Sequence, residues 1–151
     1  MRLLLDTHTF LWFVLNDSSL GITPRNLIND PQNDILLSPA SPWEIAIKIS
    51  IGKYRLPGPF TDFMDRQITE NDLYILPITV AHAAVVAALP FHHKDPFDRL
   101  VIAQAIVEAV PILSADVIFD SYPVTRIWRA KTDRGLPFPR SRAVDRRMTH
   151  P

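Results

Sequence analysis

Four carboxylates lie at separated points of the 151-residue chain, each just after a predicted strand or in the first turn of a predicted helix. Carboxylate oxygens bind hard divalent cations such as Mg²⁺, and a bound cation activates water and neutralises phosphate charge. Close anions repel one another by about 4 kcal/mol per pair at an effective dielectric of about 20, so a fold that groups them needs a cation. The sequence therefore predicts a metal-dependent hydrolytic site formed by Asp6, Glu44, Asp98 and Asp116.

Each of these acids also has a purely structural interpretation. The segment Ser41-Pro42-Trp43-Glu44 has the form of a capping box, with Ser at the N-cap and Pro at the first helical position. Asp95-Pro96-Phe97-Asp98 has the same form, and Asp6 could cap the helix that follows it. Taken singly, capping is the simpler explanation of each acid. Their joint placement is what favours a metal site.

The acids can converge only if the surrounding elements bring them together. Short apolar runs that read as strands alternate with segments of helical periodicity, which is typical of a parallel sheet covered on both faces. In such sheets ligands bind beyond the carboxyl ends of the strands. Strands are predicted at 2–5, 35–37, 73–76, 111–113 and near 124–128, and helices at 7–15, from the Thr23-Pro24 start, at 41–51, 60–69, 80–89 and 95–109, with a helical turn at 117–120.

Composition places the chain among ordinary globular proteins. There is no cysteine and no apolar run long enough to cross a membrane, so we expect a soluble, cytoplasmic protein with no disulfides. Residues 1–128 carry nine basic and fourteen acidic residues, whereas residues 129–151 carry seven and two. This basic tail is either a flexible, solvated terminus or a segment that holds RNA.

Four ordered motifs resemble those of a known family. They are Leu4–His8, Trp43–Lys48, His92–Ala105, and Leu113–Asp116 with Phe119. Together they resemble the PIN-domain nucleases, specifically the VapC-like toxins of type II toxin–antitoxin pairs, and the resemblance covers residues 1–128. It implies a three-layer α/β/α fold with a central parallel sheet. It also implies Mg²⁺- or Mn²⁺-dependent endoribonuclease activity on RNA, a cognate antitoxin protein, and a homodimer.

The acidic quartet of that family falls on Asp6, Glu44, Asp98 and Asp116. Asp95 is an extra acid in the third motif. It is a metal ligand, a residue that contacts the ligands, or the N-cap of the helix that follows. The tail after about residue 129 has no counterpart in the family.

Two further side chains have open roles beside the quartet. Thr7 could donate to a metal-bound water or to phosphate, and Lys48 is either an ion-pair partner of Glu44 or a phosphate contact. His92 and His93 are more readily explained as exposed loop residues or substrate contacts than as a transition-metal site.

Apolar side chains raise a separate question about partners. The helix at 7–15 contains Phe10, Trp12, Phe13 and Leu15, which are either core residues or part of an exposed groove, and core is favoured. The segment 57–63 is a similar candidate for a partner contact.

Two rival functions fit part of the pattern. The first is a catalytically silent PIN-like module that binds RNA or protein. The second is a phosphohydrolase of the haloacid-dehalogenase type, which also begins with an Asp after the first strand. That chemistry normally needs a second Asp where this chain has His8.

Overall fold

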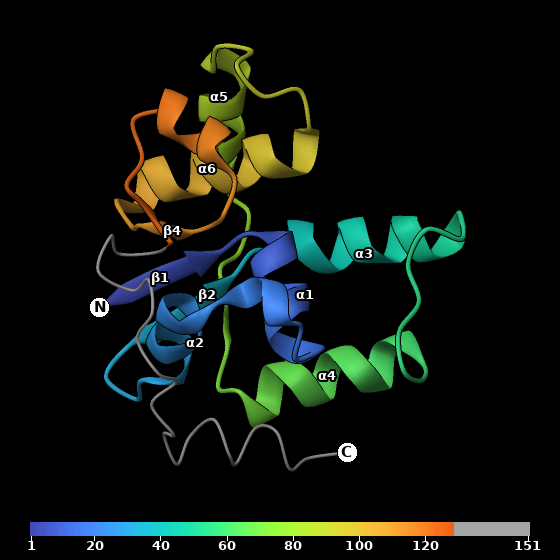
Figure 1. The fold of residues 1–151 in the computed structure, drawn as a ribbon. Coiled ribbons are helices and arrows are strands. Elements are labelled where there is room, and N and C mark those ends of the chain that lie inside the picture. Colours follow the sequence, from blue (N-terminus) through green and yellow to red (C-terminus); the bar gives the residue numbers. More distant parts are fainter. Residues whose placement is uncertain (129–151) are drawn as a thin grey trace.

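Five parallel strands form the central sheet of the computed structural model, which describes residues 1–128 (Figure 1). In spatial order the sheet runs β3-β2-β1-β4-β5. The strands are β1 (Arg2–Leu5), β2 (Asp34–Leu37), β3 (Tyr74–Ile75), β4 (Ile112–Leu113) and β5 (Arg126–Ile127). All the predicted strands are confirmed, whereas the predicted basic tail lies outside the described residues.

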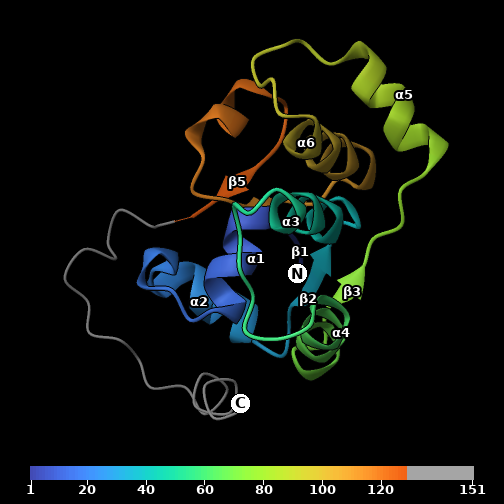
Figure 2. The same ribbon diagram turned by 90° about the vertical axis from the view of Figure 1, so that its right-hand side faces the viewer.

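Helices cover both faces of this sheet. Figure 2 shows α1, α2 and α4 on one side and α6 on the other. The helices are α1 (Thr7–Val14), α2 (Ile22–Asn29), α3 (Ala40–Ser50), α4 (Phe60–Glu70), α5 (Val80–Ala88) and α6 (Pro96–Glu108), with short 3₁₀ turns η1 (Ser18–Leu20) and η2 (Val117–Ser121). None of the helices within residues 1–128 has both the length and the apolar character needed to cross a membrane.

Alternating side chains of β1 divide the core into two parts. Leu3 and Leu5 pack with α1, α2 and α4, whereas Leu4 packs with α6 on the opposite face. All three leucines are fully buried. The sheet is therefore the middle of three layers, which confirms the predicted α/β/α architecture.

The register of the central strands aligns their carboxyl ends. Leu5 pairs with Leu37 of β2 and with Leu113 of β4. The residues that follow these strands, among them Asp6 and Ser114, therefore emerge side by side at one edge of the sheet. The helices α3 and α6 contact each other and α1 contacts α3, so all three helices border this edge.

Two predicted helix starts are wrong. Thr23 and Pro24 do not begin α2, which starts at Ile22 after Gly21 (φ 77°). Ser41 is not an N-cap either, because α3 already begins at Ala40. The hydroxyl of Ser38 accepts the Ala40 N–H at 3.1 Å, so an earlier serine satisfies that donor.

The aromatic residues of α1 are mainly core residues, as predicted. Phe10 and Phe13 are buried, Trp12 is partly buried, and Leu15 is 43% exposed. Leu15 lines a hollow of about 380 Å³ together with Pro57 and neighbouring residues of α4.

A buried arginine holds the loop that leads into α6. The guanidinium of Arg99 donates hydrogen bonds to the backbone carbonyls of Val86, Leu89, Pro90 and His93. The hydroxyl of Tyr122 donates to the carbonyl of Pro90 at 2.7 Å and accepts the N–H of His93 at 2.8 Å. Both side chains are at least 95% buried, so residues 89–95 form a fixed loop.

Arg99→Lys is expected to lower the free energy of unfolding by about 2–3 kcal/mol. A single ammonium group cannot span four carbonyls, and buried acceptors left unpaired are costly. Urea denaturation followed by circular dichroism measures the change. The control is Phe91→Ala, which removes an exposed ring from the face of the guanidinium and should cost no more than about 1 kcal/mol. A lysine variant as stable as the parent would contradict the role assigned to Arg99.

Candidate active site

Asp6 joins the first strand to the first helix. One of its oxygens, Oδ1, accepts the N–H of Thr9 at 2.8 Å and caps α1, and Oδ2 accepts the hydroxyl of Ser114 at 2.5 Å. The side chain is buried, and burial raises the pKa of Asp6 because desolvation outweighs these hydrogen bonds. Asp6 is therefore a helix cap, as one interpretation predicted, but it also faces the end of β4.

Ser114 links two of the carboxylates. It is fully buried, donates to Asp6, and accepts the backbone N–H of Asp116 at 3.0 Å. Asp116 in turn caps η2, because its Oδ1 accepts the N–H of Ile118 at 3.0 Å. Ser114 was not predicted as a site residue, although it lies within the fourth motif.

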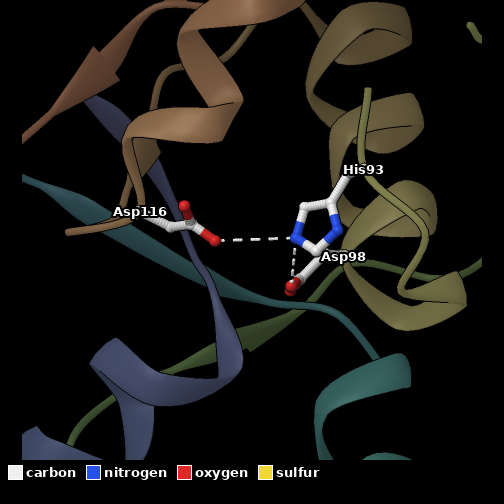
Figure 3. A group of neighbouring side chains, drawn as sticks. All are labelled: His93, Asp98 and Asp116. Atoms are coloured by element: carbon white, nitrogen blue, oxygen red, sulfur yellow. Dashed lines mark ion pairs between the residues drawn. The ribbon is translucent and has the colours of Figure 1, made fainter. Parts of the chain in front are cut away.

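Asp98 and Asp116 meet at the side chain of His93 (Figure 3). The Nε2 of His93 lies 2.9 Å from Oδ2 of Asp98 and 3.5 Å from Oδ2 of Asp116. These three residues offer ligand atoms within 4.8 Å of one another, which is close enough to share a cation. His92 lies apart from them, with its ring centroid 5.2 Å from that of Tyr122. Of the two histidines, only His93 joins the acids.

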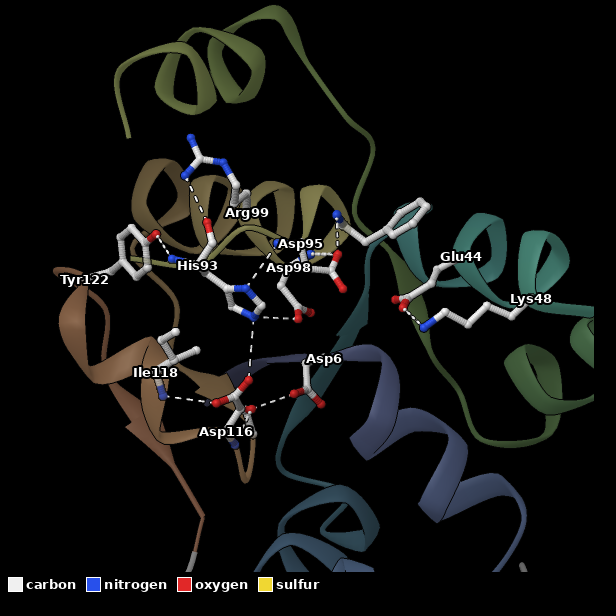
Figure 4. A network of polar contacts seen from close by, with 12 residues as sticks. Asp6, Glu44, Lys48, His93, Asp95, Asp98, Arg99, Asp116, Ile118 and Tyr122 are labelled. Atoms are coloured by element: carbon white, nitrogen blue, oxygen red, sulfur yellow. Dashed lines mark hydrogen bonds and ion pairs between the residues drawn. The ribbon is translucent and has the colours of Figure 1, made fainter. Parts of the chain in front are cut away.

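Burial and neighbouring acids both act on Asp98. The pKa of Asp98 is raised to about 8, first by burial and then by the charges of four neighbouring carboxylates. Those neighbours are Asp95, Asp6, Glu44 and Asp116, in order of decreasing effect. Figure 4 shows these side chains gathered around the ends of β1, α3 and α6. The structure therefore brings together all four acids of the predicted quartet, with Asp95 beside them.

Glu44 approaches the cluster from α3. Its Oε2 lies 3.1 Å from Nζ of Lys48, so the predicted ion pair between these residues is confirmed. The other oxygen, Oε1, is buried and has no hydrogen-bond partner among the described residues. The capping-box interpretation of Glu44 is wrong, because the predicted N-cap Ser41 lies inside the helix.

The two remaining candidates have structural contacts. Asp95 caps α6, because its Oδ1 accepts the N–H groups of Phe97 at 2.8 Å and Asp98 at 3.3 Å. The cap interpretation of Asp95 is therefore confirmed. The hydroxyl of Thr7 is buried and donates to Ser41 at 2.9 Å, so its proton connects α1 to α3.

The arrangement is a candidate metal site built from oxygen donors. The charges of Asp6, Glu44 and Asp116, from distant parts of the chain, all act on Asp98, and close carboxylates repel one another without a counter-charge. The unpartnered oxygen of Glu44 is a free acceptor in the same region. This donor set suits a hard divalent cation rather than a soft one.

Known proteins resemble the chain in sequence and in fold. Ribonuclease VapC16 of Mycobacterium tuberculosis is 37% identical over 60 residues, which cover 40% of this chain and 43% of that relative, so the alignment spans less than half of either. VapBC2 of Rickettsia felis, solved with a DNA fragment from its promoter, superposes with a TM-score of 0.65 at 15% identity, covering 85% of this chain and all of that one. FitAB, solved with the IR36 DNA fragment, gives 0.63 at 18% identity, with 85% and 97% covered. The PIN domain family model matches residues 3–124, which include every carboxylate of the cluster, and the chain therefore belongs to the PIN domain family.

Proposed function

We propose that residues 1–128 form a divalent-metal-dependent endoribonuclease that acts as the toxin of a toxin–antitoxin pair. The observation that carries the proposal is the convergence of Asp6, Glu44, Asp98 and Asp116 at the carboxyl ends of parallel strands. The partial likeness to a ribonuclease of the VapC group supports the same activity. For the basic segment 129–151 we propose a role in holding RNA, because it concentrates positive charge beside an acidic body.

The residues present fit Mg²⁺ or Mn²⁺. We infer that Asp6 and Asp98 are direct ligands and that Asp116 and Glu44 bind directly or through water. Asp6 and Asp116 each use Oδ1 for capping. When bound, such a cation lowers the pKa of a coordinated water and neutralises phosphate charge for in-line attack.

The chain's own residues prepare the site for this reaction. Ser114 holds Asp6 and Asp116 in a fixed relation, and the loop clamped by Arg99 fixes the approach to Asp98. Lys48 neutralises one oxygen of Glu44 and leaves the other free. The haloacid-dehalogenase alternative is not supported, because the chain belongs to the PIN domain family.

Asp6→Asn is expected to reduce RNA cleavage by at least about 100-fold, because it removes a ligand charge. The fold should persist, since Asn caps helices about as well as Asp. Cleavage of a panel of tRNA, rRNA and mRNA with Mg²⁺, and with EDTA as a blank, measures the loss. The matched control is Asp17→Asn, which alters another capping aspartate outside the cluster and should leave cleavage unchanged. A folded, fully active Asp6→Asn protein would overturn the assignment. A parent that binds cations but cleaves none of these RNAs would instead favour the silent module.

The metal-free protein is expected to lose thermal stability as the pH rises from about 5 to about 9. The pKa of Asp98 is about 8 in the folded chain and near 3.8 without its surroundings, so the folded state retains a proton that the unfolded state has already released. The stabilisation from this proton is complete at pH values below the pKa of Asp98 in the unfolded chain. It is lost as the pH rises through the pKa of Asp98 in the folded chain.

Melting temperatures measured in EDTA across this range test the expectation. Asp98→Asn should flatten the dependence, and added Mg²⁺ or Mn²⁺ should restore stability at high pH. Asp120→Asn is the control. The hydrogen bond and charge of Arg126 lower the pKa of Asp120, so any effect of Asp120 on the melting temperature falls at more acidic pH and the slope between about pH 5 and about pH 9 should remain. An Asp98→Asn protein that keeps the full slope would show that the acids do not interact in this way.

We further propose an antitoxin partner and a homodimer. VapBC2 was solved with a promoter DNA fragment and FitAB with the IR36 DNA fragment, and the VapC-like resemblance implies a small inhibitory protein. Co-expression with the neighbouring reading frame should yield a stable complex whose RNA cleavage is suppressed. Size-exclusion chromatography with light scattering measures the stoichiometry. Failure of every adjacent frame to co-purify would contradict the pairing.

A further inference from the structure

The two ring nitrogens of His93 have different surroundings. Its Nδ1 accepts the backbone N–H of Asp95 at 3.2 Å. A backbone N–H is always a donor, so Nδ1 must offer its lone pair. Because a neutral imidazole has one donor and one acceptor nitrogen, the proton of His93 is on Nε2.

The ring cannot readily exchange these two nitrogens. The backbone N–H of His93 donates to Tyr122 at 2.8 Å, and its carbonyl accepts from Arg99 at 3.3 Å. The ring packs against Phe119 with centroids 5.9 Å apart, and the side chain is only 15% exposed. A ring flip would give up the bond to Asp95, so the surrounding loop fixes the tautomer as well as the position.

The surroundings of Nε2 agree with a proton there. This atom is buried and lies 2.9 Å from Asp98 and 3.5 Å from Asp116, both of which offer carboxylate oxygens. An N–H at this place is attracted to the oxygens of both carboxyl groups. Nε2 has no aligned hydrogen-bond partner among the described residues, so its N–H is committed to neither carboxyl group and lies near both.

We propose that His93 is a positioning residue that keeps its proton on Nε2 and holds the carboxylates of Asp98 and Asp116 toward the cation, and that it is not a metal ligand. Coordination by Nε2 would require the lone pair that the Asp95 contact denies it. Mutating a residue that contacts and orients a metal ligand commonly lowers metal affinity by about 10–100-fold. The consequence for catalysis rests on the proposed nuclease function.

The tautomer can be observed directly in the unmodified chain. Long-range ¹H–¹⁵N correlation spectra of the full-length protein, labelled with ¹⁵N-histidine, distinguish the two nitrogens of each ring. The His93→Gln spectrum assigns the signals. We expect the Nε2–H form of His93 in EDTA and again in saturating Mg²⁺. A proton on Nδ1, or loss of the Nε2 proton when Mg²⁺ is added, would overturn the proposal.

Two substitutions separate a donor from a ligand. His93→Ala should weaken Mg²⁺ and Mn²⁺ binding by about 10-fold or more, measured by isothermal titration calorimetry. His93→Gln retains an N–H donor near the position of Nε2 and should recover most of this affinity. The control, His92→Gln, alters the neighbouring ring that packs on Tyr122 and should leave cation binding unchanged.

A ligand role would give a different pattern. Both variants would then lose Zn²⁺ affinity far more than Mg²⁺ affinity, because imidazole is a preferred ligand of Zn²⁺. That pattern would overturn the proposal. These readouts do not depend on RNA, so a parent protein that binds cations with the expected tautomer but cleaves no RNA would refute the nuclease function alone.

Discussion

The parallel pairing of β1 with β2 and β4 is the constraint on which the site depends. Because Leu5 is in register with Leu37 and Leu113, the chain leaves all three strands at one level. Asp6 and Ser114 then meet directly, and the helices that carry Glu44 and Asp98 start close by. A shift of one residue in either pairing would turn alternate side chains to the opposite face of the sheet and separate these groups.

The cluster holds charge where a folded protein would ordinarily avoid it. Asp6 and Glu44 are both nearly fully buried, and the pKa of Asp98 rises because burial and neighbouring anions oppose its ionisation. The protein offsets part of this strain with Lys48 and with the hydroxyl of Ser114. A bound cation would relieve the remaining repulsion, and this relief would contribute to its binding affinity.

Much of this arrangement could be predicted, because hydrophobic patterns specify elements and parallel sheets place ligands at strand ends. The three-layer fold, the strands and the cap at Asp95 followed from such rules. The helix start at Ala40 did not, because its N-cap is Pro39, which has no capping side chain, and Ser38 satisfies the Ala40 N–H from outside the helix. The place of His93 among the acids also escaped prediction. It depends on Arg99 and Tyr122, whose hydrogen bonds to the backbone of His93 hold the loop in place.

Three aspartates of the cluster also hold the backbone. Asp6, Asp95 and Asp116 each give one oxygen to the N-terminus of a helix or turn. An amide side chain could take over that task without carrying charge. An Asp-to-Asn substitution at these positions would therefore remove the negative charge and leave the capping hydrogen bond in place. A lineage could lose the reaction in one mutational step and still produce a folded chain that competes with active copies for whatever binds its surface.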